Sequence, residues 1–172
     1  MKQIIPIRFG ITFLGILFLA VGCGSYRLGT TLPDYLQTVY VPTFENKTYQ
    51  PGIEVDITNA VITRYRQDGN LRPVSEDQAD TVLRGEITGW ERRVMGYTGE
   101  DDDVVEEYRL YVVAVITFVE RSTGEALIAR RRVRGYTDFF VEGDLVEDED
   151  AARPKAYKDL ARRIVDQSVS IW

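Results

Sequence analysis

Cysteine is the residue type with the most distinctive chemistry here, because Cys23 is the only one in 172 residues. It follows an uncharged apolar run at residues 9–21, which is preceded by Lys2 and Arg8 and followed by Gly22. A positive start, a short apolar centre and a small residue at the exit are the pattern of a secretory signal peptide. The run has 13 residues, fewer than the about 20 that a membrane-spanning helix needs.

Two interpretations of Cys23 follow. A lone cysteine is most often a small, buried, inert side chain. Alternatively, AVGC at residues 20–23 is a bacterial lipobox, whose thiol is acylated (with palmitate among the acyl chains) and becomes the first residue of the mature protein. A lipobox usually begins with Leu, whereas Ala20 stands here and Leu19 lies one step earlier. The position at the expected cleavage site favours lipidation. We therefore expect a signal peptide at 1–22, a lipidated tether at 23–37 and a single domain at 38–172.

The other titratable residues argue against catalysis. The sequence has no His, which removes the usual general base, triad partner and commonest metal ligand. No serine elbow, metal-ligand cluster or glycine-rich phosphate loop is visible, so a carboxylate-dependent hydrolase is the least favoured function. The net charge is −6, and it becomes −8 once cleavage lowers Lys+Arg from 21 to 19 against 27 acids. This acidity argues against nucleic-acid binding. We predict no catalytic residue, no cofactor, no metal and no nucleic-acid partner.

Three arginines alternate along one predicted strand and are the best candidates for binding an anion. In IARRRVRGY, Arg130, Arg132 and Arg134 fall on one strand face. Like charges on one face repel, so they require anionic neighbours. Acids on adjacent strands, Glu86 or Glu106 among them, would make an ordinary solvated charge row. Phosphate groups are the alternative, because they match the guanidinium fork.

Two acidic runs, at residues 99–107 and 142–150, contain enough carboxylates to hold a divalent cation through oxygen ligands. Neither run matches the EF-hand loop pattern, and both lie at predicted turns. We interpret them as solvated loop tips.

The elements that must position these side chains are strands and two helices. Segments rich in β-branched and aromatic residues, or alternating in polarity, predict strands at 38–44, 81–95, 107–121 and 125–140. Apolar residues spaced by three and four predict helices at 53–68 and about 152–171. Consecutive hairpins and two amphipathic helices predict an α+β two-layer sandwich, with a mainly antiparallel four-stranded sheet in the order β-α-β-β-β-α.

The predicted strand at 109–119 is apolar on both faces. One face carries Leu110, Val112 and Ala114, and the other carries Tyr111, Val113 and Val115. A sheet with one solvated face should alternate apolar and polar residues. Either the domain covers both faces itself, or its helices cover one face and a partner covers the other.

Several segments resemble a known family when read in order. Cys23 is followed by GSYRLG, then by VYVPTFENKTYQPGIEVDITNAVITRY at 39–65 and ADTVLRGEITGW at 79–90. In order and spacing these are similar to the LptE-type outer-membrane lipopolysaccharide-assembly lipoprotein family. The resemblance is most specific over residues 39–65.

The resemblance implies a non-enzymatic accessory protein, lipid-anchored on the periplasmic side of the bacterial outer membrane. Such proteins assist the assembly of a large β-barrel lipopolysaccharide translocon, plug its lumen and contact lipopolysaccharide. On this basis the arginine row is the expected lipopolysaccharide site, and the expected interface with the barrel comprises Trp90, Tyr111, Val113 and Val115. The alternative is a stand-alone, periplasm-facing lipoprotein that binds an amphiphilic ligand.

Overall fold

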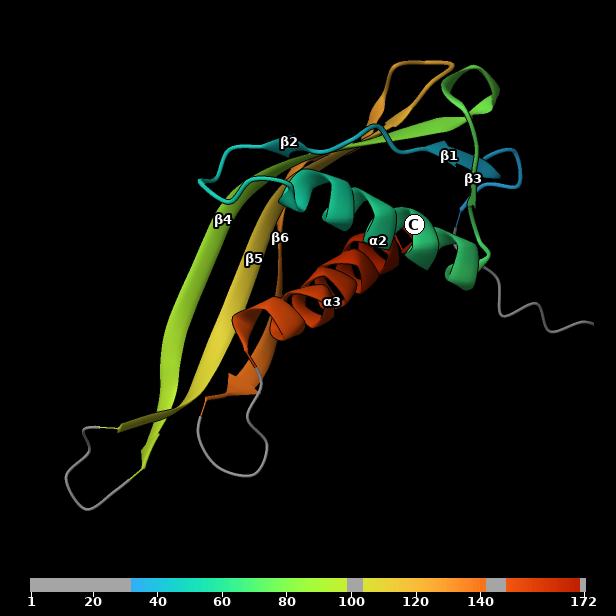
Figure 1. The fold of residues 1–172 in the computed structure, drawn as a ribbon. Helices are drawn as coiled ribbons and strands as arrows, with labels where there is room; N and C mark the ends of the chain where they lie inside the picture. The colour runs from blue at the N-terminus through green and yellow to red at the C-terminus, as the bar shows by residue number, and fades with distance from the viewer. Residues whose placement is uncertain (1–31, 99–103, 142–147, 171–172) are drawn as a thin grey trace, which may run out of the picture.

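Two helices lie on one face of a long, twisted β-sheet in the computed structural model (Figure 1). The structure describes residues 32–98, 104–141 and 148–170. Cys23, the predicted signal peptide and most of both acidic runs lie outside the described residues.

Three long strands form most of the sheet. They are β4 (Thr81–Thr98), β5 (Val104–Glu120) and β6 (Ala126–Phe140), paired antiparallel in chain order. Three short strands complete it: β1 (Thr38–Tyr40), β2 (Glu45–Asn46) and β3 (Arg72–Pro73). The sheet order is β3-β1-β4-β5-β6, with β2 also paired to β4.

The helices are α2 (Ile53–Asp68) and α3 (Glu149–Val169), with a short 3₁₀ helix η2 at Glu76–Gln78. Gly69 ends α2 in the left-handed conformation, and its N–H donates to the carbonyl of Tyr65 at 3.1 Å. Helix α3 begins earlier than predicted, because the Asp148 carboxylate accepts the Ala151 N–H at 2.7 Å and caps its first turn.

The α+β class, the two layers and the two helices are confirmed, but the predicted four-stranded, mainly antiparallel sheet was wrong. The sheet has six strands and is mixed. Of the predicted strand at 38–44 only the first three residues form a strand, β1, and β2 follows just beyond it; each is parallel to β4, with Val39 opposite Thr81 and Glu45 opposite Glu86. Pro42 lies between them and lacks an N–H for pairing. Strand β3 is parallel to β1 because α2 carries the chain back across the sheet.

The packed domain begins before residue 38. Leu32 and Leu36 are buried in the core, and the Leu36 N–H donates to the carbonyl of Pro33 at 2.9 Å. Leu32 and Leu36 therefore pack with the domain, although the sequence placed them in the predicted tether at 23–37.

The core lies between the sheet and the helices, and two glycines permit close contact there. A Cβ on Gly135 of β6 would lie 2.4 Å from the backbone nitrogen of Leu160, so α3 packs directly on this strand. A Cβ on Gly85 would lie 2.3 Å from the ring of Phe44, which covers that position of β4. A larger residue at Gly135 would push α3 away from the sheet, and one at Gly85 would displace the Phe44 ring.

Asp80 ties the first strand to the centre of the sheet. Its carboxylate accepts the backbone N–H groups of Gln37 and Thr38 at 3.0 Å each, and the Thr38 hydroxyl at 2.7 Å. Burial alone would raise the pKa of Asp80, but the hydrogen bonds from Thr38 and Gln37 outweigh it and hold the pKa below the usual value. The AD pair at 79–80 thus has a structural role.

Candidate functional site

The sheet face turned away from both helices is the candidate site (Figure 1). We call it the open face. Its charged, aromatic and central apolar residues come from all three long strands: Arg84, Glu86, Glu91 and Arg93 from β4, Glu107, Arg109, Tyr111, Val113 and Val115 from β5, and Arg130, Arg132, Arg134, Tyr136 and Asp138 from β6.

The two apolar faces of β5 are covered in different ways. Its Leu110, Val112 and Ala114 side chains are 0% exposed beneath the helices. Tyr111 and Val113 point the other way, where the described residues provide no covering helix, yet they are only 9% and 5% exposed. Long side chains of the neighbouring strands cover them instead. The helices therefore cover one apolar face of β5, long side chains of the sheet itself cover the other, and a partner on that face stays a prediction.

Tyr111 is the centre of a cluster of arginines and aromatic rings. The guanidinium carbon of Arg134 lies 4.6 Å from the Tyr111 ring centroid, and that of Arg93 lies 5.4 Å away. The Tyr136 ring is 6.0 Å from Tyr111, and Arg109 lies 4.6 Å over Tyr136. Cation–π contacts hold these guanidinium groups over the apolar centre while most of their charge stays near solvent.

Some arginines of the open face are already paired. Arg130 reaches Glu86 at 3.2 Å, and Arg93 binds both carboxylate oxygens of Glu91, at 2.7 and 3.1 Å. The hydrogen bond from Arg93 is the main reason that the pKa of Glu91 lies below its ordinary value. The Arg109–Asp138 contact is also bidentate, and the hydrogen bond to Asp138 raises the pKa of the guanidinium.

Arg132 and Arg134 differ, because neither forms an ion pair with any described residue. Both side chains are exposed on the open face. Counting the charged residues that define this face, six arginines stand against four acids, a local charge of +2 in a chain of net charge −6. An anionic group can therefore bind these two guanidiniums without displacing a carboxylate.

The predicted arginine row is thus present, but its members are not equivalent. Arg132 lies opposite Val115 and Arg134 opposite Val113. Arg130 lies in a β-bulge opposite Thr117 with φ of 43°, and its guanidinium reaches across β5 to Glu86. The predicted pairing with an acidic neighbour is present at Arg130. Phosphate binding by Arg132 and Arg134 stays a prediction.

Trp90 lies on the opposite face from the rest of the predicted interface. Its ring centroid is 6.1 Å from that of Tyr157, and Arg153 lies 5.2 Å over it, both on α3. The cause is a bulge between Ile87 and Gly89, which inverts the side-chain alternation along β4. Tyr111, Val113 and Val115 share the open face, and Trp90 packs under α3.

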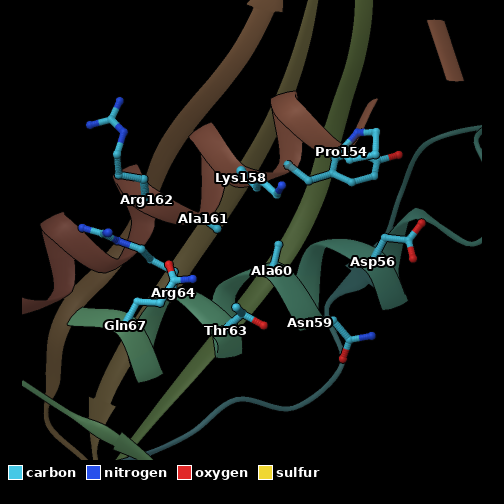
Figure 2. Close-up of a pocket in the computed structure, with 11 residues that line it drawn as sticks. Asp56, Asn59, Ala60, Thr63, Arg64, Gln67, Pro154, Lys158, Ala161 and Arg162 are labelled. Atoms are coloured by element: carbon cyan, nitrogen blue, oxygen red, sulfur yellow. The ribbon is translucent and has the colours of Figure 1, made fainter. Parts of the chain in front are cut away.

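A second candidate is a groove of about 560 Å³ between α2 and α3 (Figure 2). Ala60 and Ala161 lie in its floor, and Arg64 and Arg162 line it. Asp166 already pairs with Arg64 at 3.3 Å and with Arg162 at 3.4 Å. Because these guanidiniums are paired within the domain, the groove offers an anion less than the open face does.

Among the described residues no group of three His, Cys, Asp or Glu side chains is placed to hold a metal ion. Neither described helix combines the length and apolar character needed to cross a membrane.

Comparison with known proteins shows which family this chain belongs to. The family model described as lipopolysaccharide-assembly, LptE, matches residues 36–168. The chain belongs to the LptE family. The match includes both helices and all the strands of the open face, so the candidate site lies within the family domain.

Three solved structures share the fold of this LptE-family chain. They are a minor lipoprotein from Acinetobacter baumannii (15% identity, TM-score 0.51, 78% of this chain and 93% of that chain), a hypothetical protein from Chlamydia trachomatis (10%, 0.55, 78% and 97%) and a protein from Xanthomonas campestris (11%, 0.56, 78% and 84%). At these identities the likeness shows the fold alone. No curated protein matches the sequence.

Three further residues of the open face in this LptE-family domain, Arg93, Arg109 and Tyr136, were not predicted as site residues. The sequence shows that these residues are charged or aromatic. Their proximity to Tyr111 depends on the register of three strands, and the bulges of β4 and β6 are not readable from alternation alone.

Proposed function

We propose that this protein is a lipid-anchored accessory subunit of the outer-membrane lipopolysaccharide translocon. It is attached through Cys23 to the periplasmic side of the outer membrane, assists the assembly of a large β-barrel partner, plugs that barrel, and contacts lipopolysaccharide. The membership of the LptE family supports an assembly role. The open face supports the contacts, because it combines an apolar centre with unpaired arginines.

The main support for a contact with lipopolysaccharide comes from the side chains of Arg132 and Arg134. Both are exposed, form no ion pair with a described residue, and lie beside the apolar centre made by Tyr111, Val113 and Val115. Lipopolysaccharide combines phosphate groups with an apolar part. Its phosphates match the guanidinium forks, and the Arg130–Glu86 pair can exchange carboxylate for phosphate.

The test is the triple variant Arg130→Gln, Arg132→Gln, Arg134→Gln, assayed for binding to purified lipopolysaccharide. Charge-assisted hydrogen bonds contribute about 1.5–3 kcal/mol each, so losing two predicts about a 100-fold weaker affinity. A charge-matched control replaces three exposed arginines outside the open face, Arg66, Arg72 and Arg131, with Gln. Unchanged binding by a triple variant whose thermal melt matches wild type would contradict the proposed contact.

The barrel contact is tested separately by co-purification from detergent-solubilised outer membranes. We expect a stoichiometric β-barrel protein with the wild type, and its loss with Val113→Lys in the centre of the open face. Val55→Lys is the control for the added charge, and the test counts only if the thermal melt of Val113→Lys matches wild type, because Val113 is 5% exposed and Val55 is 52% exposed. Recovery of the wild-type domain alone would refute the barrel contact, and retention of the barrel by Val113→Lys would place that contact elsewhere.

A second candidate function is amphiphile binding by a protein that works without a barrel. The groove between α2 and α3 supports it, because a volume of about 560 Å³ and a floor of small apolar residues suit a small ligand. Ala60→Trp would fill the groove. If this variant loses bound lipid while the triple arginine variant keeps it, the groove is the binding site.

A further inference from the structure

Strand β4 has a free edge along its second half. On the side away from β5, β1 pairs with β4 at Thr81 and Val82, and β2 pairs with it at Glu86 and Ile87. Beyond Ile87, no strand among the described residues pairs on that side, although β4 continues to Thr98 (Figure 1). Two strands of the chain itself thus use this edge, and its next segment is open to a third.

The register of the sheet shows which backbone groups are available there. The Tyr136 N–H points away from β5, because it donates to the Asp159 carboxylate of α3 at 3.1 Å. Tyr136 and Tyr111 are therefore a non-hydrogen-bonded pair, and the backbone of Tyr111 faces Glu91 of β4 instead. By alternation, the N–H and C=O groups of β4 that point away from β5 are those of Trp90, Arg92 and Val94.

This open segment has the length of an ordinary strand. Its register with β5 is uninterrupted over the six residues from Gly89 to Val94, and bulges follow. Apolar side chains are exposed at its far end, where Val94, Met95 and Tyr97 are 38%, 45% and 55% exposed. Exposed apolar residues gathered on an open strand edge indicate a surface that another chain covers.

The charges of this segment are already balanced inside the chain. Arg93 binds both carboxylate oxygens of Glu91, at 2.7 and 3.1 Å, and Arg92 lies 3.2 Å from Glu149 of α3. The charged side chains from Gly89 to Val94 therefore need no ion from a partner. A segment that pairs with this edge should be uncharged, because burying a charge without a partner is costly.

A rigid loop forms a hollow at the start of the edge. In the loop between β2 and α2, the Asn46 side-chain oxygen accepts the Thr48 N–H at 2.9 Å and the Thr48 hydroxyl at 2.8 Å. The same loop holds the Tyr49 side chain fully exposed. A hollow of about 320 Å³ lies between this loop and residues 88–90 of β4. It has room for one large side chain of an added strand.

We propose that this edge, residues 88–94 together with the Tyr49 loop, binds an extended, uncharged segment of the β-barrel partner. The segment adds a strand to the sheet through the outward backbone groups of Trp90, Arg92 and Val94, and one large apolar side chain enters the hollow beside Tyr49. This inference rests on the proposed function, since it names how that partner is held, and it concerns a surface other than the centre of the open face.

The segment comes from a loop or a terminus of the barrel protein rather than from its wall. Strands of a closed barrel are paired on both sides and have no free edge. A segment that reaches into the lumen keeps its backbone groups available for β4. The edge also adjoins the open face, because Glu91 and Arg93 of β4 belong to that face, so one enclosing partner can contact both surfaces.

Proline at position 94 tests the main-chain pairing. The N–H that Val94→Pro removes points away from β5, and proline is tolerated at such positions of an edge strand. We expect at least about tenfold less barrel to co-purify from detergent-solubilised outer membranes, because a hydrogen bond is lost and the ring fills the space of the added strand. Val94→Thr is the matched control, since it keeps the N–H and a β-branched side chain, and it should retain the barrel.

Hydrogen exchange of the wild-type chain is a second measurement that needs no substitution, with electron-transfer fragmentation to resolve single amides. In the full chain purified without the barrel, the amides of Trp90, Arg92 and Val94 should exchange rapidly. In the complex with the barrel they should exchange at least about tenfold more slowly. The amides of Glu91 and Arg93 point toward β5 and are the internal control, because they should be protected in both samples.

The outcomes separate this inference from the proposed function. If Val94→Pro retains the barrel and the three outward amides exchange equally fast with and without it, the edge is not a contact, although the proposed function stands. Protection of these amides without the barrel, increasing with protein concentration, would assign the edge to a second copy and overturn the proposal. Recovery of the wild type without any barrel would refute both.

Discussion

Replacing Gly135 with Ala tests whether the close contact between α3 and β6 holds the two layers together. The new Cβ would lie 2.4 Å from the backbone nitrogen and 2.6 Å from the Cα of Leu160. The obstacle is helix backbone, so a side-chain rotation cannot relieve it. Helix α3 must move by about 1 Å to reach ordinary van der Waals contact, which loosens the buried Ala156 and Leu160.

The expected loss of stability is about 2 kcal/mol. Overpacking of this kind costs about 3 kcal/mol. The reduced freedom of the unfolded chain on replacing Gly with Ala returns up to about 1 kcal/mol. For a chain of this size, 2 kcal/mol lowers the melting temperature by about 6 °C.

Circular dichroism during thermal and urea unfolding measures this loss. Gly96→Ala is the matched control in the same sheet, because its Cβ would meet nothing closer than 3.8 Å and its stability should stay within about 1 kcal/mol of wild type. The shift of α3 should also disturb the open face, since Asp159 beside Leu160 accepts the Tyr136 N–H at 3.1 Å. If Gly135→Ala is as stable as Gly96→Ala, the close contact does not have the assigned role.

Three further predictions concern single groups. Because the pKa of Asp80 is lowered by folding, its contribution to stability is complete above the ordinary Asp pKa of about 3.9 and is lost as the pH falls through the lower folded value. Asp80→Asn should therefore lower the free energy of unfolding by about 2 kcal/mol at pH 7. It should also flatten the fall in stability at acid pH. If the stability of the variant falls with pH in parallel with the wild type, the Asp80 carboxylate does not have this role. Tyr65→Phe should cost about 1 kcal/mol in urea unfolding, because the buried Tyr65 hydroxyl bonds Ser168 at 2.7 Å, whereas the exposed Tyr49→Phe should cost nothing. Cys23→Ser should abolish acyl labelling and membrane retention, and a mature, lipid-labelled Cys23→Ser protein would disprove lipidation at that site.

Elements governed by local chemistry could be predicted closely. The predicted helix at 53–68 matches α2 at both ends, because an apolar face and a terminal glycine act within a few residues of each other. The long strands agree to within three residues at each end, because hairpins pair neighbours in the chain. The two-residue strands β2 and β3 were missed and β1 was predicted too long, since two or three residues carry too little pattern.

In the candidate site, too, some features could be predicted from the sequence and others depend on the tertiary structure. The sequence alone determined that Arg130, Arg132 and Arg134 alternate on one strand and that β5 is apolar on both faces, because alternation is a property of consecutive residues. The tertiary structure decided which face the helices leave open, that Arg130 is held by Glu86, and that Trp90 lies under α3. Those outcomes depend on strand register and on single-residue bulges, which invert every side chain that follows them and leave no periodic trace in the sequence.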